Sequence, residues 1–147
     1  MSCIKKLNAP LPQKEFGLSV MTGLGLLSDS AGLPLIGTLS KKILHEGFVP
    51  DVSDQAHLEG AFGPMWIKGG AVWSWSVHLR WDFRKDEKWM PFAIGGMGGN
   101  FVPEKLGKRQ EFFPKFGVGA FYTLGENLKL RGEVSHTWIG IGVASFF

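Results

Sequence analysis

The sequence has a single cysteine, no long apolar run and little net charge. The lone Cys3 excludes an internal disulfide, and no Cys-x-x-Cys or His-x-x-x-His spacing indicates a metal site. No stretch of about 18 apolar residues is free of charge, which excludes a transmembrane helix. The net charge of +3 is small and evenly scattered, so nucleic acid is not an expected partner. The 147 residues predict one domain, and no motif predicts a cofactor.

What the chain does have is glycine and aromatic residues, with 21 Gly, 12 Phe and 6 Trp. Its clearest pattern covers residues 71–84, where bulky apolar side chains alternate with polar or charged ones. A period of two is typical of a β-strand whose two faces meet different surroundings. One face carries Trp73, Trp75, Val77, Leu79 and Trp81, and the other carries Ser76, His78, Arg80 and Asp82. In a membrane β-barrel the apolar face meets lipid, whereas a soluble barrel reverses this facing.

Similar alternation predicts further strands, separated by turn residues. The expected strands are 15–27, 33–46, 55–67, 71–84, 89–101, 112–124, 128–135 and 138–147, after a polar tail at 1–14. Residues 33–46 also fit a short amphipathic helix with Leu35, Leu39 and Ile43 on one side. Residues 16–27 loosely resemble a signal peptide, but their alternation favours a first strand. The pattern predicts an all-β protein, an eight-stranded antiparallel up-and-down transmembrane β-barrel over residues 15–147.

The alternation also assigns the faces of the strands. The side chains expected to form a charge network inside the lumen are His57, Glu59, His78, Arg80, Asp82, Lys115, Lys129, Arg131 and Glu133. Besides the face of 71–84 above, those expected to meet lipid include Phe116, Val118, Ile139, Ile141 and Val143. Met90, Phe92 and Ile94 are also expected outward. The tryptophans expected in aromatic girdles at the membrane interfaces are Trp66, Trp73, Trp75, Trp81, Trp89 and Trp138.

The C-terminal half resembles the small outer-membrane β-barrel superfamily, which includes the OmpA transmembrane domain, the opacity proteins and the lipid A deacylases. The resemblance covers about residues 55–147 and rests on Pro91-Phe92 before a glycine-rich strand, on residues 116–133 and on the closing IGIGVASFF. It implies a bacterial outer-membrane location, with the export signal absent from the chain. It also implies a monomer in contact with lipid and lipopolysaccharide, and it marks Phe147 as the signal for the outer-membrane assembly machinery. The fold hosts adhesins, enzymes and structural barrels, so the resemblance fixes no activity.

Two other functions remain as alternatives to a non-catalytic structural or surface-interaction role. A soluble lipocalin-like barrel would enclose an apolar ligand between Trp73, Trp75, Leu79 and Trp81. A lipid A-modifying hydrolase would need Ser, His and an acid on the outer face, with His and Ser two residues apart. Here Trp138 stands two residues after His136, and Ser135 should point to the opposite face. We therefore expect no catalytic residues.

Overall fold

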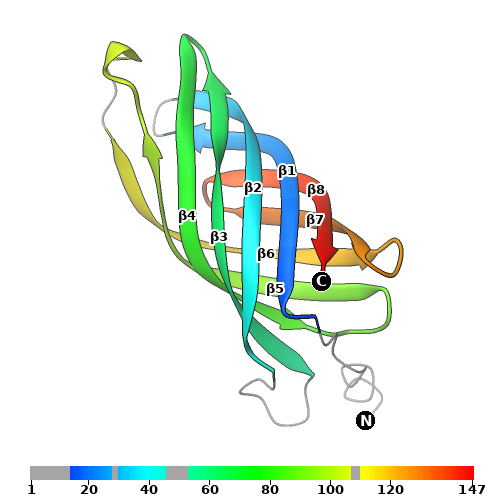
Figure 1. Cartoon of the computed structure of the whole chain (residues 1–147). Coiled ribbons are helices and arrows are strands. Elements are labelled where there is room, and N and C mark those ends of the chain that lie inside the picture. Colours follow the sequence, from blue (N-terminus) through cyan, green and yellow to red (C-terminus); the bar gives the residue numbers. More distant parts are fainter. Residues whose placement is uncertain (1–13, 28–29, 46–52, 107–109) are drawn as a thin grey trace.

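The chain folds into a closed barrel of eight antiparallel strands, each paired with its neighbours in sequence, and β1 closes against β8 (Figure 1). This computed structural model describes residues 14–27, 30–45, 53–106 and 110–147. The strands are β1 (Phe16–Leu27), β2 (Ser30–Leu44), β3 (Asp54–Ile67), β4 (Gly70–Phe83), β5 (Trp89–Phe101), β6 (Glu111–Thr123), β7 (Leu128–Ser135) and β8 (Trp138–Phe146). A 3-10 turn, η2 (Glu104–Leu106), follows β5. Within these ranges no helix is long and apolar enough to cross a membrane.

The predicted eight-stranded antiparallel barrel is confirmed, and residues 33–46 fall largely within strand β2. The helical alternative rested on Leu35, Leu39 and Ile43. Residues four apart also lie on the same face of a β-strand, so this spacing fits both structures. The residues between them decide, because Ile36, Thr38 and Ser40 are buried while Leu33 and Leu39 are exposed. The predicted tail lies outside the described residues except for Lys14, as does most of the connection between β2 and β3.

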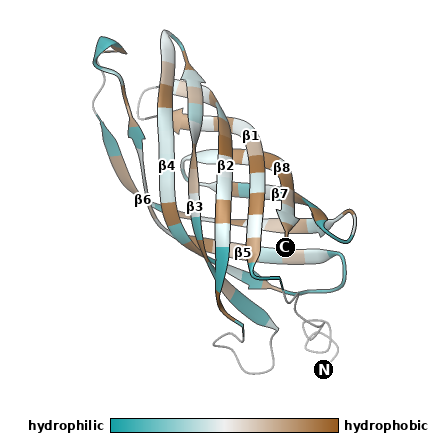
Figure 2. Cartoon of the chain, in the orientation of Figure 1, coloured by the Kyte–Doolittle hydropathy of each residue, from teal (hydrophilic) through white to brown (hydrophobic). Residues whose placement is uncertain are grey.

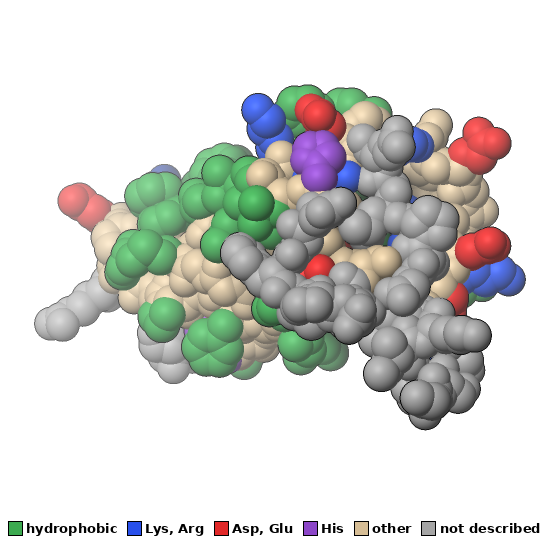
Figure 3. Space-filling model, turned by 90° about the horizontal axis from the view of Figure 1, so that it is seen from below, with side chains coloured by type: hydrophobic (Ala, Val, Ile, Leu, Met, Phe, Trp, Pro, Cys, Tyr) green, Lys and Arg blue, Asp and Glu red, His purple; other side chains and the backbone are tan. Residues whose placement is uncertain are grey.

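Hydrophobic and more polar residues alternate along the strands (Figure 2), and the exposed side chains of the barrel wall are mostly apolar. Val77 and Leu79 are each about half exposed, at 52% and 51%, and so are Phe116, Val118, Ile139, Ile141 and Val143. Trp73 is exposed as well, while Trp75 and Trp81 are half-buried because neighbouring rings cover them. From below, charged side chains gather around the rim and hydrophobic ones over the wall (Figure 3).

The facing expected for the start of β5 is wrong. Met90, Phe92 and Ile94 are buried in the lumen, and Pro91 and Ala93 occupy the outer face. The ladder explains this, because Ile94 pairs with Arg80 and Phe92 with Asp82, and directly paired residues share a face. Apolar residues stand on both faces of this segment, so its alternation carried no signal.

The barrel wall is not equally high all round. β2 to β6 have 13 to 15 residues each, but β7 has 8 and β8 has 9. The ladder between β6 and β7 stops at Gly117 and Ser135. Beyond it, Glu111–Phe116 of β6 pair with β5 alone among the described strands. We call this gap above the β7–β8 turn the notch, the end of the barrel that contains it the notched end, and the opposite end, where β1 begins and β8 finishes, the terminal end.

The four strand prolines lie at gaps in a ladder or beyond its last residue pair. Pro114 lies in the part of β6 that has no β7 partner, and Pro91 lies one residue beyond the last pair of β4 with β5. Pro34 and Pro64 lie beside interruptions of the β1–β2 and β2–β3 ladders. A proline has no N–H to donate, so these positions cost the sheet little.

Candidate functional site in the barrel lumen

Charged side chains from β3, β4, β6 and β7 meet inside the barrel. All nine side chains expected in the lumen are buried, with exposed fractions between 0% and 8%: His57, Glu59, His78, Arg80, Asp82, Lys115, Lys129, Arg131 and Glu133. Each lies on a strand whose alternate residues face outward and are mostly apolar. The structure adds two buried charges that the sequence reasoning missed, Lys42 and Asp54, and the buried polar Gln55 and Asn100.

Glu59 stands at the centre of the network. Arg131 holds its carboxylate in a two-pronged contact, with Nη1 2.9 Å from Oε2 and Nη2 2.5 Å from Oε1. Arg80 Nη1 donates to Oε2, and the His78 Nε2 lies 2.9 Å from Oε1. Such charge-assisted, two-pronged hydrogen bonds are the strong ones, and they offset the cost of removing the charges from water.

Two further carboxylates extend the network towards the two ends of the barrel. Arg80 Nε donates to Asp82 Oδ1 at 2.8 Å, and His57 Nδ1 lies 3.1 Å from Asp82 Oδ2. Arg131 Nη2 donates to Glu133 Oε2 at 2.7 Å. Each arginine therefore bridges Glu59 and a second carboxylate, which links β3, β4 and β7 through side chains alone.

Aromatic rings lie against both arginines. The Arg80 guanidinium carbon lies 4.9 Å from the centre of the Phe121 ring, and that of Arg131 lies 5.1 Å from the Phe92 ring. Phe146 lies within 5.7 Å of Arg80. Cation–π contacts of this kind contribute about 2 kcal/mol when water is excluded. The inward Phe92 that the sequence reasoning placed outside thus belongs to the site.

Trp138 is also placed inside rather than in an outer girdle. It is buried, and its Nε1 donates to Glu133 Oε1 at 2.9 Å. The ring lies against Gly140, where an added Cβ would come within 2.5 Å of it. As the first residue of β8 after a tight turn, Trp138 follows the parity of Gly140 and Gly142, opposite to the outward Ile139 and Ile141.

Ser135 and His136 lie apart in their contacts. The Ser135 hydroxyl lies 3.2 Å from that of Thr137, whereas the exposed His136 stacks on Phe116 with ring centres 4.4 Å apart. A serine, a histidine and an acid do meet elsewhere: Ser76 Oγ lies 3.3 Å from His78 Nδ1, whose Nε2 faces Glu59. The signal was available, because Ser76 and His78 are two residues apart on one strand face.

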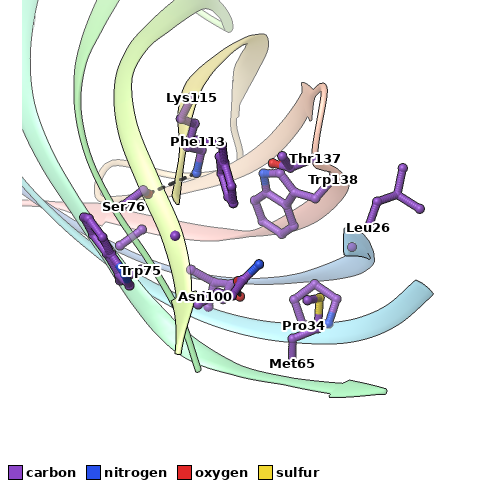
Figure 4. Close-up of a pocket in the computed structure, with 15 residues that line it drawn as sticks. Leu26, Pro34, Met65, Trp75, Ser76, Asn100, Phe113, Lys115, Thr137 and Trp138 are labelled. Atoms are coloured by element: carbon purple, nitrogen blue, oxygen red, sulfur yellow. Dashed lines mark hydrogen bonds between the residues drawn. The ribbon is translucent and has the colours of Figure 1, made fainter. Parts of the chain in front are cut away.

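A cavity of about 50 Å³ lies behind the notch, above this network (Figure 4). One wall is apolar and comes from β2 and β3, with Pro34, Ile36 and Met65. The opposite wall carries the polar groups of Asn100 on β5 and Lys115 on β6 beside the Phe113 ring, and Trp138 also lines the space (Figure 4). In the described part of the chain no group of three or more His, Cys, Asp or Glu could hold a metal ion.

This architecture is that of the small eight-stranded transmembrane barrels. The chain is similar to a de novo designed transmembrane β-barrel, with a TM-score of 0.66 and 16% identity over 95% of this chain and 100% of that one. It is also similar to Ail, the attachment invasion locus protein of Yersinia pestis, with a TM-score of 0.58 and 12% identity over 90% and 96% of the two chains. Ail in complex with the heparin analogue sucrose octasulfate matches with a TM-score of 0.52 and 11% identity over 90% and 96% of the two chains. No family model and no curated protein sequence matches.

Proposed function

We propose that the protein is a small integral barrel of a bacterial outer membrane, with a structural or surface-interaction role and no catalysis. One observation carries the proposal: outward side chains around the wall are apolar, while ionised groups are enclosed. A charge facing lipid at the bilayer midplane costs roughly 2–4 kcal/mol, so this facing is the one that a membrane selects.

Aromatic rings near both ends of the wall support a membrane position. Trp81 packs on Phe83, Trp89 on Tyr122 and Phe16 on Phe147 near the terminal end. Phe62 packs on Trp73, and Trp75 packs on Phe101 and Phe112, nearer the notched end. Rings at such positions favour the two membrane–water interfaces. Lipid and lipopolysaccharide are the partners that this surface fits.

The last residue completes the barrel. Phe147 exchanges two backbone hydrogen bonds with Phe16, both 2.9 Å long. A sheet in lipid must close, because unpaired backbone groups at its edges find no water. We propose that Phe147 also serves as the recognition signal for the outer-membrane assembly machinery, and that the closed barrel is a monomer.

The soluble alternative requires the opposite facing. A lipocalin-like barrel would enclose Trp73, Trp75, Leu79 and Trp81, but these side chains point outward. Eight strands can enclose either packed side chains or one small ligand, and here the interior holds an ion network instead of an apolar chamber. This favours the membrane protein over the ligand carrier.

Detergent dependence tests the membrane proposal. We expect a monodisperse chain only in detergent or bilayers, with a faster gel mobility before heating than after it. Val77→Arg, in the middle of the apolar wall, should reduce membrane insertion by roughly 2–4 kcal/mol. The matched control Glu87→Arg, in the exposed β4–β5 turn, should insert like the native chain. A monodisperse monomer without detergent would overturn the proposal.

The proposed lack of catalysis is tested with lipopolysaccharide. We expect mass spectrometry to show no deacylated product, because the Glu59 carboxylate beside His78 is already bound by two arginines. Product that disappears in His136→Ala would establish a deacylase-like site on the outer face. Product that disappears only in Ser76→Ala would establish one in the lumen.

A further inference from the structure

The notch connects two surfaces that the ion network does not use. Inside lies the cavity lined by Gly25, Thr137 and Trp138. Outside, directly below the β7–β8 turn, a shallow groove continues from Leu24 and Ile139 down to Ala120 and Gly132. Leu24 pairs with Ile139 and Gly25 with Trp138, so the cavity and the groove begin at adjacent residues of the same two strands.

The groove has an apolar floor and walls. Gly132 points outward, and a Cβ added there would meet no atom within 4 Å. Val118, Val134 and Ile141 form the sides, each about half exposed or more. A groove of this shape and polarity suits an unbranched hydrocarbon chain lying along the wall.

The cavity supplies a cation with unused donors. Lys115 Nζ donates to Ser76 Oγ at 3.2 Å, and its nearest carboxylate oxygen, Glu133 Oε1, is 3.8 Å away. An ammonium group carries three N–H donors, so Lys115 can still donate to an anion. The lumen as described also encloses five buried cationic side chains against three buried carboxylates: Lys42, Arg80, Lys115, Lys129 and Arg131, against Glu59, Asp82 and Glu133.

The exposed strand edge at the notch disfavours a protein partner. A chain added to β6 would need its backbone donors, but Pro114 has none. His136 covers the next position, with Nδ1 3.4 Å from the Phe116 carbonyl oxygen and its ring stacked on Phe116. An amphiphile that uses side chains and apolar surface, and not the backbone, fits the notch better.

We propose that the notch binds a long-chain fatty acid, with the carboxylate in the cavity against Lys115 and the hydrocarbon chain in the groove over Gly132. This deepens the proposed surface-interaction role and rests on the membrane location. The direction agrees with that location, because the head lies near the notched end and the chain points towards the middle of the apolar wall.

The test uses palmitate with a ¹³C-labelled carboxyl carbon and the folded protein in micelles of a zwitterionic detergent. Equilibrium dialysis against protein-free micelles should show saturable binding, with a shifted carboxyl resonance. Lys115→Met should weaken binding by about tenfold, the scale of one charge-assisted hydrogen bond. Lys129→Met, which removes a buried lysine near the terminal end, should bind like the native chain. Hexadecanol, which has no charge, should bind Lys115→Met and the native chain with equal affinity.

The groove is tested in the same way. Gly132→Leu should weaken palmitate binding several-fold by filling the groove. Gly60→Leu is the matched control, because Gly60 also faces outward into open space but lies on β3, away from the notch. Each variant is first checked for the heat-dependent gel shift, and Lys115→Gln replaces Lys115→Met if the latter does not fold.

Three results would overturn the fatty-acid site: non-saturable partition into micelles, native affinity in the Lys115 variant, or equal losses in the two glycine variants. Displacement of palmitate by an equimolar phosphorylated lipid A would assign the cavity to a phosphate instead. None of these results bears on the membrane location, since a barrel that folds only in detergent and binds no palmitate would refute this inference alone.

Discussion

The two ends of the lumen are built differently although the same strands form both. Towards the terminal end all eight strands pair with both neighbours. Ion pairs and aromatic rings fill the space around Arg80 and Arg131 there. Towards the notched end β7 and β8 have already turned back, and a cavity remains between Met65, Asn100 and Trp138. The difference teaches that the short hairpin, not the lumen composition, creates the opening. The end filled by charges should be intolerant of change, and the notched end tolerant.

The largest expected effect is at the centre of the ion network. Glu59→Gln removes the charge that both arginines share and leaves two buried cations under-compensated, so it should cost about 3–5 kcal/mol of unfolding free energy. Urea unfolding in bilayers, followed by tryptophan fluorescence, measures this cost. The matched comparison is Glu111→Gln at the notched end, where Glu111 accepts a hydrogen bond from Asn100. This variant should cost about 1 kcal/mol of unfolding free energy. Equal costs would break the comparison.

Two glycines test the space in each half. A Cβ at Gly119 would lie 2.3 Å from the Gly132 carbonyl oxygen and 2.3 Å from the Phe92 ring, neither of which can move far. A Cβ at Gly25 would lie 2.4 Å from the Met65 sulfur, the end of a flexible side chain beside the cavity. We expect Gly119→Ala to cost roughly 1–3 kcal/mol and Gly25→Ala less than about 1 kcal/mol.

The same urea experiment measures both glycine variants. A Gly25→Ala variant as unstable as Gly119→Ala would mean that Met65 cannot withdraw, and that the cavity is not free space.

Sequence reasoning predicted the central ion network better than the notch. Period-two alternation identified every charged member of the central network, because a charge inside a membrane barrel is marked by its apolar neighbours on either side. It failed for Phe92, where both faces are apolar, and it had no means to place Asp54 at the edge of a strand. The notch depends on where β7 ends relative to β6, which is a property of pairing register. Nothing in the local pattern of Glu111–Phe116 indicates that this segment has no β7 partner. The one hint is Pro114, since a proline within a predicted strand favours an unpaired edge.

The Ser76–His78 pair shows a different limit. Its spacing was readable, but the acid comes from another strand, through the pairing of His78 with Glu59. Which carboxylate meets a histidine across a ladder is fixed by register, and register was not part of the sequence argument. The same holds for Lys115, whose place at the cavity follows from the lack of a β7 partner beside it.

The smallest expected effect compares one turn from each end. At the terminal end Asp86 closes the β4–β5 turn, and its Oδ1 accepts the N–H groups of Lys88 and Trp89, both at 2.8 Å. These two hydrogen bonds lower the pKa of Asp86. At the notched end the β3–β4 turn relies on Gly69, which has a φ of 96°. Glycine has no titratable side chain, so this contribution does not depend on pH.

The two turns should therefore respond differently to pH. Because the folded-state pKa of Asp86 is lowered, its contribution is fully present above the unfolded-state pKa and is lost as the pH falls through the folded-state value. We expect Asp86→Ala to lower the urea midpoint slightly at neutral pH and to match the native chain in acid below that value. Glu87→Ala, the neighbouring exposed carboxylate, should change neither midpoint. Gly69→Ala should lower the midpoint equally at both pH values, since its strain does not titrate. A loss in Asp86→Ala that is equally large in acid would show that the charge of this carboxylate is not what stabilises the turn.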